Sequence, residues 1–183
     1  MRGFYKIYKN LLIKYPLGVQ AFQTGTLMAV GDQLAQNLVE KRKLKDLDFL
    51  RTAQFYAIGF CFGGPAVRTW YGILDKYIGS KGGLVTIKKV AIDQILFAPT
   101  FIVLLLTTIG IMQGNDATSI KNKLKNEYTD ILWNNYKLWP MVQLVNFAFV
   151  PLNYQVLVVQ CVAVLWNCYV SYRTNRDPIK NTQ

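Results

Sequence analysis

The sequence predicts an all-α, polytopic helical membrane protein with about four transmembrane helices. Apolar residues make up 52% of the 183 residues and charged residues only 17%, which is a more apolar balance than that of an average soluble domain. The charged residues occur in clusters between long stretches with few or no charges. Several of these stretches reach the roughly 20 apolar residues that a helix needs to cross the bilayer core. The length fits one membrane domain that covers residues 1–183.

Three of the predicted spans lie between charged loops and carry one charged residue each. They cover residues 16–39 with Asp32, residues 52–74 with Arg68, and residues 90–112 with Asp93. A charged side chain inside a bilayer is costly unless it faces the interior of a helix bundle or a water-filled cavity. We therefore expect Arg68 to pair with one of the two carboxylates, along a polar pathway or in a buried ion pair that fixes helix register. Placement near the headgroups is the other interpretation for Arg68 and Asp93.

The fourth predicted span lies in the uncharged stretch 138–172. This stretch is too short for two full spans and a turn, and it is long for one. Pro140 and Pro151 should each interrupt or begin a helix. The sequence therefore predicts a short half-inserted or interfacial helix over residues 140–149 and a full span over residues 151–172. Four spans place both termini on one side of the membrane.

Two further segments are predicted to form amphipathic helices outside the bilayer core. Residues 1–15 hold four basic and no acidic side chains, with apolar side chains at helical spacing. This pattern suits a helix that lies in the lipid interface, and it also resembles a mitochondrial import element. Residues 117–137 combine an apolar stripe with a lysine-rich face, which predicts a surface helix capped by Asp116 or Thr118.

Small residues predict close contacts between helices. Gly25 and Gly59 each begin a small-xxx-small pattern, which lets two helix backbones approach. Cys161 and Cys168 are spaced to share one helix face. They would serve as small apolar side chains or as a redox pair between the protomers of a homo-oligomer.

The net charge of +11 favours contact with anionic lipid. A nucleic-acid-binding domain would more often spread its basic residues along one continuous face, so no nucleic-acid partner is predicted. The sequence has no histidine, no nucleophile elbow, no phosphate-binding loop and no zinc motif. We therefore predict that the protein is not an enzyme and that it holds neither a metal nor a cofactor.

Polar side chains within the apolar segments supply the candidate functional residues. In lipid, such groups should turn inward, as hydrogen-bonding contacts between helices or as the wall of a wet lumen. Proline residues within or beside spans should kink helices or mark unwound turns. The pore-lining candidates are Asp32, Arg68, Asp93, Gln94, Gln143 and Asn146, and the candidates for helix breaks or gates are Pro65, Pro99, Pro140 and Pro151.

Four blocks of the sequence resemble the Mpv17/PMP22 family of mitochondrial and peroxisomal membrane proteins. The blocks are TLMAVGDQLAQ (26–36), GGPAVRTWYGILDKYI (63–78), VAIDQILFAPTF (90–101) and WNNYKLWPMVQLVNFAFVPLNYQ (133–155). The resemblance covers about residues 4–173. The runs GDQLAQNLVEKR and VVQCVAVLWNCYVSY are most similar to the mitochondrial inner-membrane branch of the family.

The resemblance implies a four-span protein of the mitochondrial inner membrane, with the peroxisomal membrane as the alternative. It also implies a weakly selective channel for small solutes or metabolites, which would support mitochondrial nucleotide supply and DNA maintenance. Two other functions fit the same residues. One is a non-conducting scaffold that binds anionic lipid and assembles partners. The other is a coupled transporter with a site at a broken helix, for which residues 140–151 are the candidate.

Overall fold

The computed structural model describes residues 2–80 and 82–175, with side chains described from residue 7 onward. All regular structure in these residues is helical, which confirms the predicted all-α class. The α-helices are α1 (Arg2–Lys14), α2 (Pro16–Leu34), α3 (Phe49–Ile58), α4 (Gly64–Ile78), α5 (Gly83–Ile92), α6 (Ala98–Met112), α7 (Ala117–Phe149) and α8 (Leu152–Asn175). Three π-helical turns, η1 (Ala35–Val39), η3 (Gly59–Gly63) and η4 (Asp93–Phe97), and one 3₁₀ turn, η2 (Leu44–Asp46), complete them.

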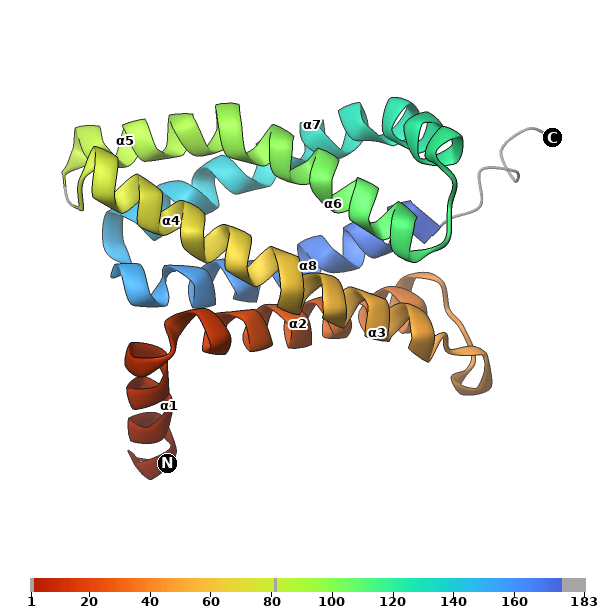
Figure 1. Ribbon diagram of the computed structural model, residues 1–183, viewed down its shortest axis with the longest axis horizontal. Helices are drawn as coiled ribbons and strands as arrows, with labels where there is room; N and C mark the ends of the chain where they lie inside the picture. Colours follow the sequence, from red (N-terminus) through yellow and green to blue (C-terminus); the bar gives the residue numbers. More distant parts are fainter. Residues whose placement is uncertain (1, 81, 176–183) are drawn as a thin grey trace.

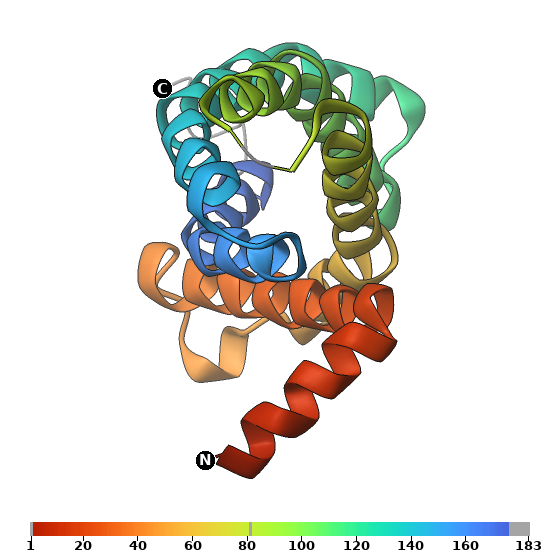
Figure 2. The same ribbon diagram turned by 90° about the vertical axis from the view of Figure 1, so that its left-hand side faces the viewer.

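Five long helical rods run alternately between two ends of the molecule (Figure 1). Because η3 joins α3 to α4 and η4 joins α5 to α6 without a break, each of these pairs forms one rod. The others are α2 with η1, α7 and α8. Viewed along the rods, they form a ring, and α1 extends away from it (Figure 2). We call the end where α2 begins the α1 end, and the opposite end the 40–48 end after the loop it carries.

Five rods run between the two ends, one more than the predicted number of spans. Helix α2 begins at the α1 end, and α8 finishes at the 40–48 end (Figure 1). Two of the described helical segments, Gly83–Met112 and Leu152–Asn175, are long and apolar enough to span a membrane by themselves. They match the predicted spans 90–112 and 151–172. The predicted count of four spans is not confirmed.

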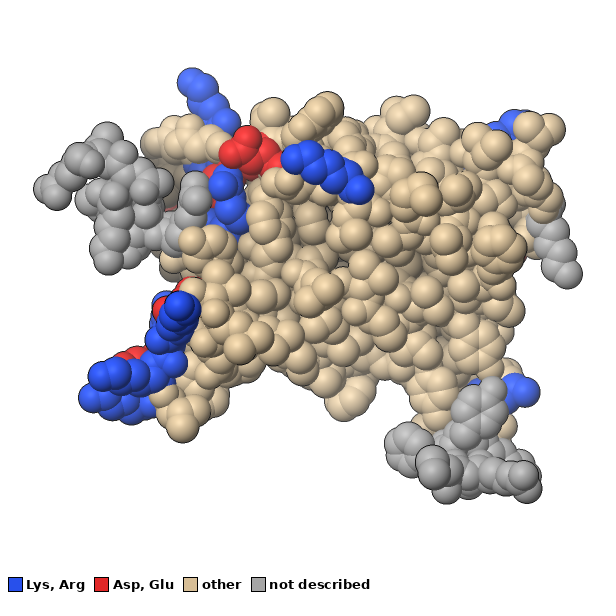
Figure 3. Space-filling view, turned by 180° about the vertical axis from the view of Figure 1, so that it is seen from behind, with Lys and Arg blue, Asp and Glu red and all other residues tan. Residues whose placement is uncertain are grey.

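The outer surface between the two ends is poor in charge. Lysine, arginine and acidic side chains gather mainly at the 40–48 end, with a few at the α1 end (Figure 3). Large apolar side chains such as Phe22, Leu96, Trp133 and Leu165 point outward, whereas many polar side chains are buried. This inverted distribution fits a protein surrounded by lipid, which does not drive apolar side chains into the interior.

Pro65 and Pro99 lie inside continuous rods and do not break them. Each occupies the second position of an α-helix that follows a π-helical turn, α4 after η3 and α6 after η4. A proline lacks the amide hydrogen and clashes with the carbonyl four residues earlier. A wider π-helical turn before the proline relieves that clash, and such turns are frequent at functional sites.

Helix α7 corrects the prediction for residues 117–149. The sequence suggested a surface helix over 117–137 and a separate short helix over 140–149, but the structure has one helix of 33 residues with Pro140 inside it. At about 1.5 Å per residue, α7 is roughly 50 Å long, which exceeds the hydrocarbon core. Its lysine-rich first turns therefore lie beyond the apolar belt. Asp116 caps the helix as predicted, since its Oδ1 accepts a hydrogen bond from the Ser119 amide at 3.1 Å.

Helix α1 keeps the features predicted for an interfacial helix. It is α-helical over Arg2–Lys14, and its apolar side chains Ile7, Leu11 and Ile13 are exposed. Leu12 is buried where the helix meets the bundle. Three exposed apolar side chains on a helix outside the ring suit contact with lipid.

Candidate functional site: an internal cavity

A space of about 100 Å³ lies inside the ring, between α2, α4, α6, α7 and α8. Its wall is largely aromatic and aliphatic. The polar side chains in the wall are Thr24, Tyr71, Asp93, Gln94, Asn135, Gln143, Gln160 and Asn167. Among the described residues, Asp93 is the one charged side chain in this wall. Concave, mostly apolar spaces with a few convergent polar groups are the usual form of a ligand site.

Asp93 is the centre of the polar part of the wall. It is the first residue of η4 and is 2% exposed. Its Oδ1 accepts a hydrogen bond from Trp70 Nε1 at 2.8 Å. Its Oδ2 accepts from Gln94 Nε2 at 2.8 Å and from Gln143 Nε2 at 3.0 Å. Donors from three different rods therefore hold one carboxylate, with no cation beside it.

A second row of hydrogen bonds extends this group. Tyr71 accepts from Gln143 Nε2 at 2.8 Å, and Asn146 Nδ2 donates to Gln143 Oε1 at 3.2 Å. The structure thus brings together four of the predicted pore-lining residues, Asp93, Gln94, Gln143 and Asn146. Asn146 is fully buried behind Gln143 and is not part of the cavity wall.

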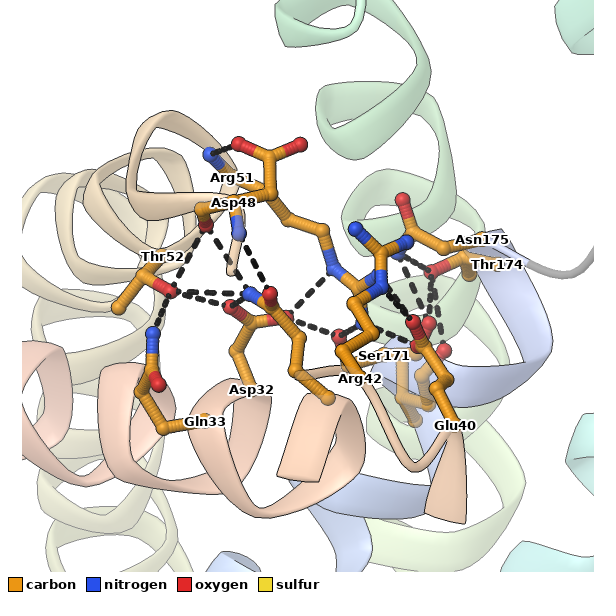
Figure 4. A network of polar contacts seen from close by, with 12 residues as sticks. Asp32, Gln33, Glu40, Arg42, Asp48, Arg51, Thr52, Ser171, Thr174 and Asn175 are labelled. Atoms are coloured by element: carbon orange, nitrogen blue, oxygen red, sulfur yellow. Dashed lines mark hydrogen bonds and ion pairs between the residues drawn. The ribbon is translucent and has the colours of Figure 1, made fainter. Parts of the chain in front are cut away.

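Asp32 lies elsewhere, at the 40–48 end. Its Oδ1 accepts from Arg51 Nε and from Ser171 Oγ, both at 2.6 Å. Arg51 also reaches Glu40, with 2.7 Å between Nη2 and Oε1. Figure 4 shows these side chains meeting where α2, α3 and α8 come together. We call Asp32, Glu40, Arg51 and Ser171 the Arg51 cluster.

Arg68 does not make the predicted ion pair with Asp32 or Asp93. Asp32 is paired with Arg51, and Asp93 receives only neutral donors. Arg68 is half-buried on α4 and is absent from the cavity wall. Arg51 lies one residue before the predicted span 52–74, in a charged segment that the sequence predicts to be a loop. Arg51 was therefore not considered as a partner for Asp32. The hairpin between α2 and α3 brings it to Asp32.

Two hydrogen-bond donors in the cavity wall have no partner among the described residues. They are Trp139 Nε1 and Asn167 Nδ2, and both side chains are more than nine-tenths buried. A buried donor without an acceptor costs about 1–3 kcal/mol. Water or a polar solute inside the cavity would supply the missing acceptor. The sequence predicts that Asn167, a polar side chain within an apolar segment, points inward, whereas it predicts Trp139 for an aromatic belt at the membrane interface.

We expect Trp70→Phe to destabilise the protein by about 1–3 kcal/mol, since it leaves one oxygen of a buried carboxylate without a donor. The substitution keeps the aromatic ring that stacks on Phe97 at a centroid distance of 5.1 Å. Denaturant unfolding in detergent measures the change. Trp133→Phe is the matched control, because Trp133 is 65% exposed. Equal losses in both variants would contradict a role for the Trp70–Asp93 hydrogen bond.

Comparison with known proteins identifies the family of the chain. The profile of the Mpv17 / PMP22 family matches residues 110–171. The chain is 42% identical to the mitochondrial inner membrane protein Mpv17 of Xenopus laevis over 177 residues, which are 97% of this chain and 100% of that protein. The chain belongs to the Mpv17/PMP22 family. Human Mpv17 is 41% identical over 95% of this chain and 99% of its own length. Protein sym-1 of Neurospora crassa is 41% identical over 90% of this chain and 95% of its own length.

No solved structure matches the chain. Membership of the Mpv17/PMP22 family confirms the resemblance noted in the sequence. Relatives from frog, fish and mammals are named mitochondrial inner membrane proteins. The chain is accordingly assigned to the mitochondrial inner membrane, as predicted.

Proposed function

We propose that this member of the Mpv17/PMP22 family is a channel for small solutes. The observation that carries the proposal is the cavity at the centre of the ring, with the Asp93 carboxylate in its wall. A cavity enclosed by rods that run between the two ends lies on the shortest route across the molecule. The two unpaired donors in its wall are suited to hydrogen bonds with a passing solute or its water.

In this proposal, the present arrangement of the helices is a non-conducting state. Towards the 40–48 end, Met28, Leu105, Ile109 and Val170 form a buried apolar cluster. The Arg51 cluster lies at that same end of the bundle. An apolar constriction blocks ions by excluding water. Conduction therefore requires the helices that carry this apolar cluster to move apart.

The selectivity of the channel should be modest. The pore-lining residues predicted from the sequence carry both signs of charge, but Asp32 and Arg68 lie outside the cavity wall. A lone carboxylate favours cations and neutral solutes over anions. Weakly selective exchange of metabolites would support the nucleotide supply and DNA maintenance that the family resemblance implies.

We expect Asp93→Asn to lower the preference for cations over anions. Single-channel recording on purified protein in a planar bilayer measures this as a shift of the reversal potential in a salt gradient. Asp130→Asn is the matched control, because Asp130 is an exposed carboxylate of α7 outside the cavity wall. If the wild type, Asp93→Asn and Asp130→Asn show conductance steps with the same ion selectivity, Asp93 does not line the conduction path. A silent bilayer from protein shown to be folded and inserted would refute the channel.

One observation favours the alternative of a non-conducting scaffold. Both oxygens of Asp93 are already occupied by donors from Trp70, Gln94 and Gln143, so the group also fits a purely structural contact between rods. In this case the exposed Lys41, Lys43 and Lys45 would bind anionic lipid. The scaffold predicts a silent bilayer and an Asp93→Asn variant whose one defect is reduced stability.

A further inference from the structure

Arg68 differs from the other partly or fully buried cations whose side chains the structure describes. Each of the others has an acceptor in the protein. These pairs are Arg42 with Glu40, Arg51 with Asp32, Lys89 with Asp75, Lys123 with the Thr174 carbonyl, and Arg173 with Asp130. Arg68 Nη1, by contrast, is buried and has no hydrogen-bond partner. Among the described residues, none therefore supplies an acceptor for this buried donor of the half-buried guanidinium.

The side chain of Arg68 is half-buried, and its position on α4 favours an inward direction over extension into lipid. Residues 64, 68, 71 and 75 share one face of the helix because they recur at three- and four-residue spacing. On this face Gly64 packs against α2, where an added Cβ would lie 2.6 Å from Ala21 Cα, and Tyr71 is 1% exposed. Arg68 thus lies on the inward face, one turn from the contact with α2 towards the α1 end.

The acid nearest along this face is already paired. Asp75 Oδ1 accepts from Lys89 Nζ at 2.9 Å, and Asp75 Oδ2 accepts from Ser80 Oγ at 3.1 Å. Arg68 lies ten residues before Ile78, the last residue of α4. Ten residues correspond to about 15 Å of helix, which places Arg68 well inside the rod. A cation at such a depth is usually paired or in contact with a water-filled cavity.

We propose that Arg68 is the central residue of a phosphate-binding site on the inward face of α4. A guanidinium presents a planar fork of donors that matches the oxygens of a phosphate, and it keeps its charge under all physiological conditions. A bound phosphate group would accept the free hydrogen of Nη1 and neutralise the buried charge. The group comes from a free phosphate-bearing solute or from a phospholipid headgroup. The inference goes beyond the proposed channel, since binding at Arg68 does not require conduction.

The test uses the full chain in phosphate-free maltoside micelles at constant ionic strength. Thermal unfolding is followed while either inorganic phosphate or phosphatidylglycerol is added. We expect a saturable rise of the melting temperature for the wild type and at least a tenfold weaker response for Arg68→Gln. Lys121→Gln, which removes an exposed lysine of α7, should respond like the wild type. A response to inorganic phosphate identifies a free solute, and a response to phosphatidylglycerol alone identifies a lipid headgroup.

Equal responses of the wild type and Arg68→Gln to both additions would overturn the proposal. If Arg68→Gln does not fold, Arg68→Lys takes its place. It keeps the charge but loses the fork, so the affinity for phosphate should fall while the response stays measurable. An unchanged affinity in Arg68→Lys would also contradict the site. The micelle experiment measures phosphate binding and not conductance. A negative result there is therefore separate from a negative result in the planar bilayer, which tests the channel.

Discussion

Arg51→Gln is expected to destabilise the protein by about 3–5 kcal/mol, the usual cost of removing one partner from a buried ion pair. The side chain of Arg51 is 4% exposed and that of Asp32 is fully buried. Without the guanidinium, Asp32 keeps neutral donors from Gln36, Thr52 and Ser171 but loses its cation. Glu40 loses a 2.7 Å contact at the same time. Denaturant unfolding of the purified protein in detergent measures the loss.

A matched variant and a double mutant separate this effect from general damage. Arg42→Gln removes the other cation that contacts Glu40, at 2.7 Å, but Arg42 lies in the exposed loop. Its loss should cost no more than about 1 kcal/mol. Asp32→Asn combined with Arg51→Gln removes both charges and should be more stable than Arg51→Gln alone, with a coupling of about 1 kcal/mol or more. A double mutant less stable than Arg51→Gln would show that the charges do not stabilise each other.

Much of the helical framework could be predicted from the sequence. Hydropathy and helical spacing identify α2, the rod of α3 and α4, and the rod of α5 and α6, because each of them carries an apolar segment between charged loops. The same criterion divided α7 incorrectly. Its first turns have the amphipathic pattern of a surface helix and its last turns carry no charge, since one helix passes from the aqueous side into the apolar belt. Pro140 favoured a break, because a proline inside a helix costs about 3 kcal/mol, yet α7 continues through it.

The candidate site could be predicted only in part. Asp93, Gln94 and Gln143 were identified because polar groups in apolar helices must find partners inside the bundle. Their actual donors depend on the arrangement of the rods, so the contribution of Trp70 could not be read from the sequence. The assignment of Arg68 to a carboxylate failed for a related reason. The sequence gives the number of charged side chains in a span, but it does not give the helix face on which each of them lies.

The close contact between Gly25 and Gly59 confirms the predicted role of these small residues and leads to the second large effect. A Cβ at position 59 would lie 2.7 Å from Gly25 Cα and 2.8 Å from the Thr24 carbonyl oxygen. Both neighbours are backbone atoms, so no side chain can rotate away to make room. We expect Gly59→Ala to cost about 1–3 kcal/mol through overpacking. The same denaturant titration in detergent measures it.

Gly72→Ala is the control that shows whether the effect arises from the contact or from the residue type. An added Cβ at position 72 meets no atom within 4 Å, and alanine is favoured over glycine within a helix by about 0.5–1 kcal/mol. Gly72→Ala should therefore be neutral or stabilising, whereas Gly59→Ala should be destabilising. The two substitutions change the stability in opposite directions only if the rod of α3 and α4 packs directly against the backbone of α2. Stabilisation by both substitutions would mean that the two rods are further apart in the membrane, and that the cavity between them is wider.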